Sequence, residues 1–85
     1  MSQIQPTLYL DVRTSEEYKA GPIEPSVNVP IDELPGRVGT LGSRRRKIVV
    51  FCRTGRRSAI ALAILRAAGF THVHDAGAIE NVRAT

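Results

Sequence analysis

One short stretch of the chain, Cys-Arg-Thr-Gly-Arg-Arg-Ser at positions 52–58, combines a nucleophile with positive charge. Cys52 is the only cysteine in the sequence, and three arginines follow it within five positions. Nearby positive charge favours the thiolate, which is the form that attacks electrophiles. Gly55 permits the left-handed backbone that turns successive N–H groups toward an anion. The stretch predicts an activated thiolate in an anion-binding loop; the structural alternative is a buried, inert cysteine before a basic turn.

The segments on either side of this loop would position the thiol. Four apolar residues that favour strands, Ile48 to Phe51, run directly into Cys52, and a helical pattern begins at Ser58. The first N–H groups of a helix have no partner within the helix, and its aligned peptide dipoles favour negative charge. We therefore expect a buried strand, a tight loop and a helix N-terminus that together lower the pKa of the thiol.

The loop resembles the active-site loop of the rhodanese-like sulfurtransferases, C-x-x-G-x-R-[SA], at every fixed position. The resemblance implies that Cys52 carries a persulfide, and that the residues after it bind the substrate. These are Arg53, Thr54, Gly55, Arg56, Arg57 and Ser58. Arg57, together with Arg53 or Arg56, would attract a small anionic donor such as thiosulfate. Related phosphatases use a loop that is one residue longer, so the spacing favours sulfur over phosphate.

A second match lies near the N-terminus, where the family has D-V-R-x-x-x-E-[FY]. Asp11, Val12, Arg13, Glu17 and Tyr18 fit this pattern. Asp11 and Arg13 would then support the pocket. The interpretation that we prefer is structural, because carboxylates and an arginine so close in sequence favour a paired polar network that holds a strand to a helix.

The resemblance to the family extends from about residue 8 to residue 79. Within the family, the chain is most similar to the small, single-domain phage-shock type. The chain departs from the family pattern at Pro22, Pro25 and Ser26, and at Ala78 in the predicted turn 75–79. Proline fixes φ and lacks an N–H, so the first two changes should stiffen their loop. Longer family members continue with a C-terminal helix. The resemblance therefore does not indicate which residues of this chain close the pocket on that side.

Strand and helix patterns alternate along the chain and predict an α/β fold, with a small, mostly parallel sheet and helices on both faces. Strands are expected at 8–12, 27–29, 48–51 and 70–74, and helices at 14–20, 31–41 and 58–68. Thr14 and Glu17 form a capping box at the first helix. The third helix is apolar nearly all round, so we expect it to be deeply packed.

The composition predicts one domain, residues 1–85, without a disulfide or a zinc cluster, because there is one cysteine. The net charge is +4, but the basic run 44–47 lacks interleaved aromatic residues, which favours a solvated loop over nucleic-acid binding. His72 and His74 lack the further ligands that a metal requires. No apolar run is long enough for a membrane span. We expect a cytoplasmic protein, or a periplasmic one if a signal peptide has been removed.

Three hypotheses follow for function. The leading one is a sulfurtransferase that moves sulfane sulfur from thiosulfate or a persulfide donor, through Cys52, to cyanide or a thiol, without a cofactor. The second is a persulfide-carrying or anion-binding module that acts with a protein partner. The third, disfavoured by the short loop, is a cysteine-dependent phosphatase or arsenate reductase.

Overall fold

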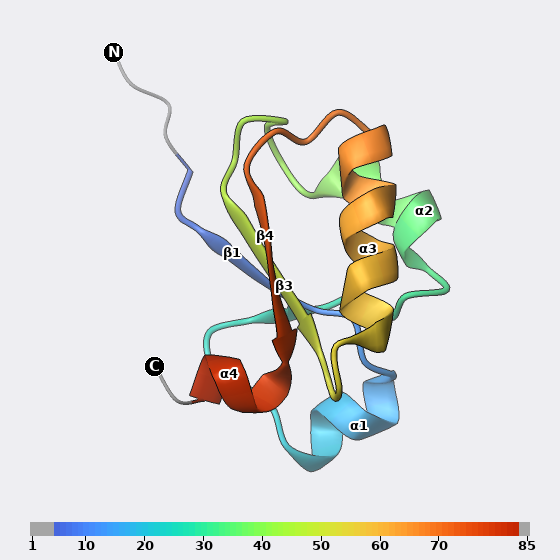
Figure 1. The fold of residues 1–85 in the computed structure, drawn as a ribbon, viewed down its shortest axis with the longest axis vertical. Helices are drawn as coiled ribbons and strands as arrows, with labels where there is room; N and C mark the ends of the chain where they lie inside the picture. Colours follow the sequence, from blue (N-terminus) through green and yellow to red (C-terminus); the bar gives the residue numbers. More distant parts are fainter. Residues whose placement is uncertain (1–4, 84–85) are drawn as a thin grey trace.

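A computed structural model describes residues 5–83 of the protein. Four parallel strands form its centre, in the order β2-β1-β3-β4 (Figure 1). The strands are β1 (Leu8–Asp11), β2 (Val27–Asn28), β3 (Ile48–Cys52) and β4 (Val73–Ala78). The helices are α1 (Ser15–Ala20), α2 (Leu34–Arg37), α3 (Arg56–Ala67) and α4 (Ile79–Arg83), with a 3-10 turn, η1, at Val38–Thr40. The predicted α/β fold with a parallel sheet is confirmed.

The main core lies between the sheet and the layer formed by α2 and α3. Alternate residues of the two central strands point into it, namely Leu8 and Leu10 from β1 and Ile48 and Val50 from β3, as the period of two in a strand requires. Leu65 of α3 is fully buried against them. The strand that ends at Cys52 is therefore fixed by packing along its whole length.

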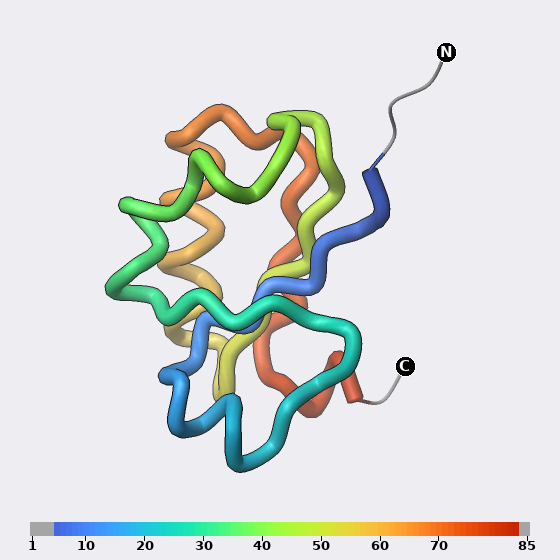
Figure 2. The backbone as a smooth tube through the Cα atoms, turned by 180° about the vertical axis from the view of Figure 1, so that it is seen from behind, coloured from blue at the N-terminus to red at the C-terminus, as the bar shows by residue number. Residues whose placement is uncertain are grey.

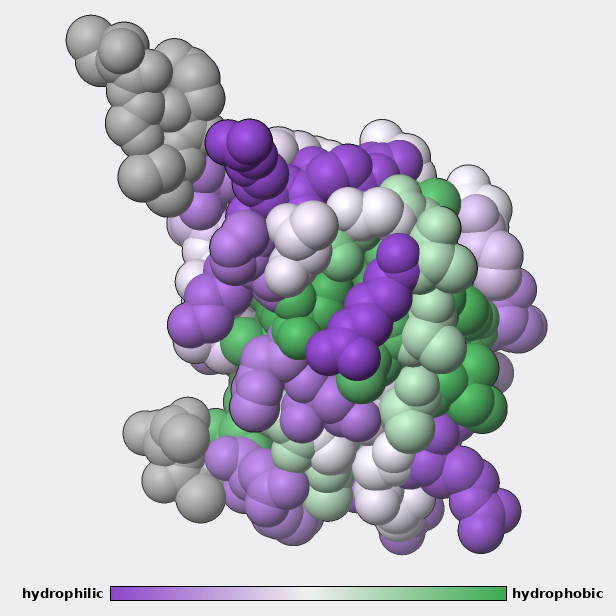
Figure 3. All heavy atoms as spheres, turned by 45° about the horizontal axis from the view of Figure 1, so that its top comes forward, coloured by the Kyte–Doolittle hydropathy of each residue, from purple (hydrophilic) through white to green (hydrophobic). Residues whose placement is uncertain are grey.

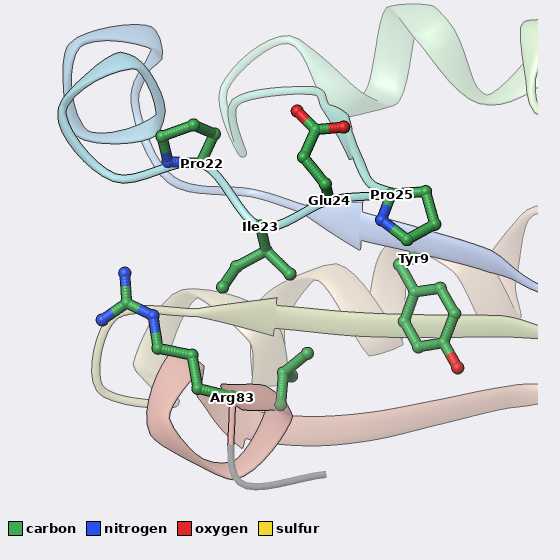
Figure 4. Close-up of a pocket in the computed structure, with 7 residues that line it drawn as sticks. Tyr9, Pro22, Ile23, Glu24, Pro25 and Arg83 are labelled. Atoms are coloured by element: carbon green, nitrogen blue, oxygen red, sulfur yellow. The ribbon is translucent and has the colours of Figure 1, made fainter.

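The opposite face of the sheet is covered only in part. α4 and the loop that follows α1 lie over one end of it, as the view from behind shows (Figure 2). Two adjoining grooves, about 440 and 560 Å³ in volume, share Tyr9 and Val82 in their lining. Figure 4 shows the first groove, in which Ile23 and Tyr9 project from the loop and from β1. Pro22 and Pro25, two of the four departures from the family pattern, also line this groove.

The expectation that α3 is deeply packed is wrong. Only Ser58, Ala61 and Leu65 of this helix are buried, and Ile60 is 52% exposed. The reason is that the sheet offers α3 one face only, and no element covers the outer side of the helix among the described residues. Apolar surface consequently lies along the side of the molecule where α3 runs (Figure 3).

The helix expected at 31–41 is also different, because it divides into α2 and η1. Gly36 and Gly39 weaken helical backbone, and Pro35 is accepted only in the first turn of α2, where it was expected. The predicted apolar stripe nevertheless faces the core: Leu34 and Leu41 are buried.

The last strand begins and ends later in the chain than the sequence predicts. β4 begins at Val73, leaves His72 outside, and runs through the segment that was expected to be a turn. An irregularity in the pairing with β3 puts Asp75 opposite Val50 and Gly77 opposite Phe51, so Ala76 is an extra residue. Gly77 has a φ of +78°, which suits glycine. The short helix α4 had no strong sequence signal and was missed.

The basic run 44–47 is not simply a solvated loop. Arg44 Nε donates to the carbonyl of Ala68 at the end of α3 (2.8 Å), and its guanidinium lies 4.6 Å from the centre of the Phe70 ring. Arg46 donates to the carbonyls of Pro6 and Leu41. These two arginines therefore connect the loop before β3 to the end of α3 and to the segments before β1 and after η1, at the end of the sheet opposite Cys52. No helix in the described part of the chain is long and apolar enough to cross a membrane.

This arrangement makes Arg44→Ala a stability variant. We expect it to lower the free energy of unfolding by about 1 kcal/mol, because it removes one hydrogen bond and one cation–π contact. Urea denaturation measures the change. Arg45→Ala, which removes the same charge from an exposed side chain beside it, should change stability by less than about 0.5 kcal/mol. Equal losses in both variants would mean that net charge, not these contacts, is responsible.

Candidate active site

Cys52 ends β3 and its sulfur is held by backbone N–H groups of the loop that follows. Gly55 N lies 3.0 Å from Sγ and Ser58 N lies 3.3 Å from it, both as hydrogen-bond donors. The Ser58 hydroxyl donates to the Gly55 carbonyl at 3.1 Å, which closes the turn. The sulfur therefore faces the first N–H groups of α3, as the sequence predicted.

The electrostatic balance at this thiol favours the thiolate. Burial raises the pKa of Cys52, because the side chain is fully inaccessible to solvent. The N–H groups of Ser58, Gly55 and Thr54, together with the nearby Ser58 hydroxyl, lower it. The net effect is a pKa below the ordinary value of a thiol. The donors thus outweigh desolvation.

Two glycines make this geometry possible. Gly55 has a φ of +100° and is the residue before the first turn of α3, which begins at Arg56, two positions earlier than expected. A Cβ on Gly55 would lie 3.6 Å from the Cα of Gly77 in β4, so the two backbones approach closely there. The loop is therefore packed against the end of β4, a contact that no local sequence pattern indicated.

Arg57 makes a two-pronged ion pair with Glu17 of α1. Nη1 lies 2.6 Å from Oε1 and Nη2 lies 3.0 Å from Oε2. These hydrogen bonds, with those from Thr14, lower the pKa of Glu17 to about 2, while the pKa of Arg57 is raised. The capping box predicted for α1 is confirmed, because Thr14 and Glu17 satisfy each other's backbone N–H groups. The same carboxylate thus caps one helix and binds another.

The predicted network of Asp11, Arg13 and Glu17 is confirmed only for its first two members. Arg13 Nη2 lies 2.7 Å from Asp11 Oδ2 and 2.9 Å from the Gly21 carbonyl, and Asp11 and Arg13 are both buried. Asn28 donates to the carbonyls of Asp11 and Arg13, which fixes the turn after β1. Glu17 belongs to the separate pair with Arg57. The sequence pattern contained Glu17 but not its partner, which lies 40 residues away.

The remaining charges of the loop point into solvent. Arg53, Thr54 and Arg56 are exposed, and in the described part of the chain neither arginine has an ion pair. Arg53 also lines a cleft of about 360 Å³ between α1 and α4, together with Arg13 and Arg83. The structure thus surrounds Cys52 with donors on the inside and with unpaired positive charge on the outside.

The donor set of this site does not suit a metal ion. Around Cys52 it consists of N–H groups and guanidinium groups, which bind anions, and residues 5–83 contain no group of three or more His, Cys, Asp or Glu side chains placed for a metal. His72 lies in a loop, where its Nδ1 is 2.9 Å from the Thr71 hydroxyl, and His74 lies on β4.

A parallel sheet with a cysteine loop at its carboxyl edge defines a class, and the chain belongs to the rhodanese-like domain family, whose model matches residues 1–82. Among named relatives it is 32% identical to thiosulfate sulfurtransferase PspE of Escherichia coli, over 87% of this chain and 72% of that protein. It is 36% identical to Bacillus subtilis YrkF, whose name gives it a proposed sulfur-carrier role, over 75% of this chain and 34% of that longer protein.

Solved structures agree. A structure described as rhodanese with anions from E. coli aligns with a TM-score of 0.83 at 32% identity, over 88% of this chain and 89% of that chain. The human single-domain sulfurtransferase TSTD1 aligns with a TM-score of 0.75 at 25% identity, over 85% of this chain and 74% of that chain. The relatives support sulfur transfer in general as the activity of the family.

The lowered pKa gives the first prediction for this site. Alkylation of Cys52 by iodoacetamide, measured against pH in the folded protein, should have its midpoint below the ordinary value of about 8.5. Ser58→Ala should raise the midpoint, because the Ser58 hydroxyl, which closes the turn by donating to the Gly55 carbonyl, also contributes to lowering the pKa of Cys52. A wild-type midpoint at or above 8.5 would contradict the activated thiolate. The reaction should be slow at any pH, since the sulfur is inaccessible in this conformation.

The Glu17–Arg57 pair gives a second prediction, on acid stability. Because the pKa of Glu17 is lowered from 4.5 to about 2, the pair stabilises the fold above pH 4.5, and this contribution is lost as the pH falls toward 2. Glu17→Gln should therefore make the unfolding free energy less dependent on pH between 4.5 and 2. We expect a difference on the order of 1 kcal/mol, reduced by solvent screening because the pair is partly exposed. Parallel pH profiles for the two proteins would contradict this account.

Proposed function

We propose that the protein is a thiosulfate sulfurtransferase that works through a persulfide on Cys52. The observation that supports this most directly is the pair of N–H groups, from Gly55 and Ser58, that point at a cysteine sulfur whose pKa is lowered. Such a site stabilises negative charge on sulfur both before and after the reaction. No metal or organic cofactor takes part in the proposed mechanism.

In the first half of the reaction the Cys52 thiolate attacks the outer sulfur of thiosulfate. A bond forms between Sγ and that sulfur, the sulfur–sulfur bond of thiosulfate breaks, and sulfite leaves with the bonding electrons. The product is the Cys52 persulfide anion, which the same N–H groups stabilise. The exposed charges of Arg53 and Arg56 favour the approach of the dianion.

In the second half an acceptor, cyanide or a thiolate, attacks the outer sulfur of the persulfide. The bond between that sulfur and Sγ breaks, and Cys52 leaves as the thiolate that the loop already stabilises. Thiocyanate or an acceptor persulfide is released. Because the leaving group has a low pKa, the loop assists this step as well as the first.

A second candidate is a sulfur carrier that exchanges sulfur with a protein partner. Two observations favour it: the sulfur of Cys52 is fully inaccessible in this conformation, and one relative has a proposed sulfur-carrier role. A partner that displaces the loop near Gly55 and Gly77 would expose the sulfur, whereas a small donor must wait for spontaneous opening. Both candidate functions use the same Cys52 persulfide. They differ in what exposes the sulfur, which is spontaneous opening of the loop for the enzyme and a protein partner for the carrier.

Intact mass measured after incubation with thiosulfate tests the proposal. We expect a gain of one sulfur atom that cyanide removes, and no gain in Cys52→Ser, because a serine hydroxyl without an adjacent base is a poor nucleophile. Cys52→Ser should keep the fold, which circular dichroism checks. Sulfur that enters but resists cyanide, and leaves only with a protein acceptor, would favour the carrier. No gain of sulfur by the wild-type protein would overturn the proposed function.

A further inference from the structure

α1 has little to hold it in place. None of its residues is buried, although Glu17 and Tyr18 are half-buried, so apolar packing contributes little to its position. Within residues 5–83 the pair of Glu17 with Arg57 is the one ion pair that joins α1 to another element. Figure 1 shows α1 beside the loop that joins β3 to α3. The C-terminal end of α1 is also held through Gly21, whose carbonyl accepts from Arg13 Nη2, so the pair of Glu17 with Arg57 is the contact that joins α1 to the Cys52 loop in particular.

The contact uses both oxygens of the Glu17 carboxylate and two of the five N–H groups of the Arg57 guanidinium. Glu17 Oε1 accepts from the Thr14 N–H (2.9 Å), from the Thr14 hydroxyl (3.1 Å) and from Arg57, and Oε2 accepts from Arg57. Because the hydrogen bonds from Arg57 and Thr14 lower the pKa of Glu17 to about 2, the pair is charged at neutral pH. The guanidinium edge formed by Nη1 and Nη2 of Arg57 is thus occupied by a carboxylate.

Arg57 lies next to the residue that matters most for the sulfur. It immediately precedes Ser58, whose N–H and hydroxyl both contribute to lowering the pKa of Cys52. An arginine whose guanidinium is fixed to a neighbouring helix restricts the backbone at the first turn of α3. Arg53, by contrast, is exposed and has no ion pair within residues 5–83. It lines a cleft whose other charged side chains all have ion pairs, namely Arg13, Glu17, Glu80 and Arg83.

We propose that Glu17 is a positioning residue, which holds Arg57 as a tie between α1 and the Cys52 loop. The charge that attracts an anionic donor then comes from Arg53 and Arg56. This inference rests on the proposed function for its statement about the donor, but not for its statement about the loop. It assigns Arg57 a different role from the one that the family motif implied, in which this arginine attracts the donor.

The double variant Glu17→Gln/Arg57→Gln separates position from charge, because it removes the ion pair and leaves the net charge unchanged. Glutamine can still accept from the Thr14 N–H, so the cap of α1 is kept. We expect the pH midpoint of Cys52 alkylation to rise, kcat for thiosulfate to fall about tenfold, and KM to stay within about twofold. Arg53→Gln should do the opposite: it should raise KM severalfold in low salt, with a smaller change in the midpoint.

Two controls complete the design. Thr14→Ala weakens the cap of α1 but keeps the pair, so it should lower stability and leave the midpoint unchanged. Arg45→Gln removes one exposed charge far from the loop, so it should change neither KM nor the midpoint. If the double variant does not fold, Arg57→Lys replaces it, because lysine keeps the charge and loses the two-pronged geometry. We then expect the same rise in the midpoint with KM unchanged.

Three results would overturn the proposal. A rise in KM without a change in the midpoint would make Arg57 a donor ligand. If the double variant keeps the wild-type alkylation midpoint, kcat and KM, the pair of Glu17 with Arg57 does not position the loop. If Thr14→Ala shifts the midpoint as much as the double variant does, the effect comes from the stability of α1. The alkylation midpoint needs no turnover. A wild-type protein that takes no sulfur from thiosulfate would therefore contradict the proposed function and still leave the role of Glu17 measurable.

Discussion

The rest of the structure depends on one requirement, which is that a buried sulfur must be able to carry negative charge. Desolvation disfavours the thiolate of Cys52, and N–H groups at the start of α3 must compensate at close range. That compensation needs the strand, the loop and the helix to be held in fixed positions relative to one another, because the N–H groups of Gly55 and Ser58 must stay within hydrogen-bond distance of the sulfur. The features around the loop can be understood as supports for this arrangement.

The supports come from three directions. Packing against α3 fixes β3, because alternate residues of the strand are buried in the main core. The close approach of Gly55 to Gly77 sets the loop against β4. The pair of Glu17 with Arg57 attaches it to α1. Apolar contacts thus hold the strand, whereas backbone geometry and a salt bridge hold the loop, and loops of this kind are easier to open. This suits a sulfur that is inaccessible at rest and must meet both a donor and an acceptor.

Positive charge in the chain serves two purposes, and composition cannot separate them. Arg13, Arg44, Arg46 and Arg57 are bound to carboxylates or to carbonyl groups, so they stabilise turns and helix ends. Arg53 and Arg56 have no ion pair in the described part of the chain and lie beside the sulfur. The net charge of +4 is therefore a poor guide to what the protein binds, and the unpaired arginines are a better one.

The sequence by itself determined the strand before Cys52, the helix after it, the capping box at Thr14 and the parallel sheet, because each depends on local patterns of apolar, turn and capping residues. It did not determine that α3 is packed on one side only, that β4 runs through a predicted turn, or that Arg44 lies over Phe70. Nor did it show that Glu17 binds Arg57 and not the Asp11–Arg13 pair. These features depend on which surfaces meet after the chain folds, and residues 40 positions apart share no local pattern. Tertiary structure therefore decided how the loop is held, while the sequence had already placed the cysteine, the glycine and the arginines in it.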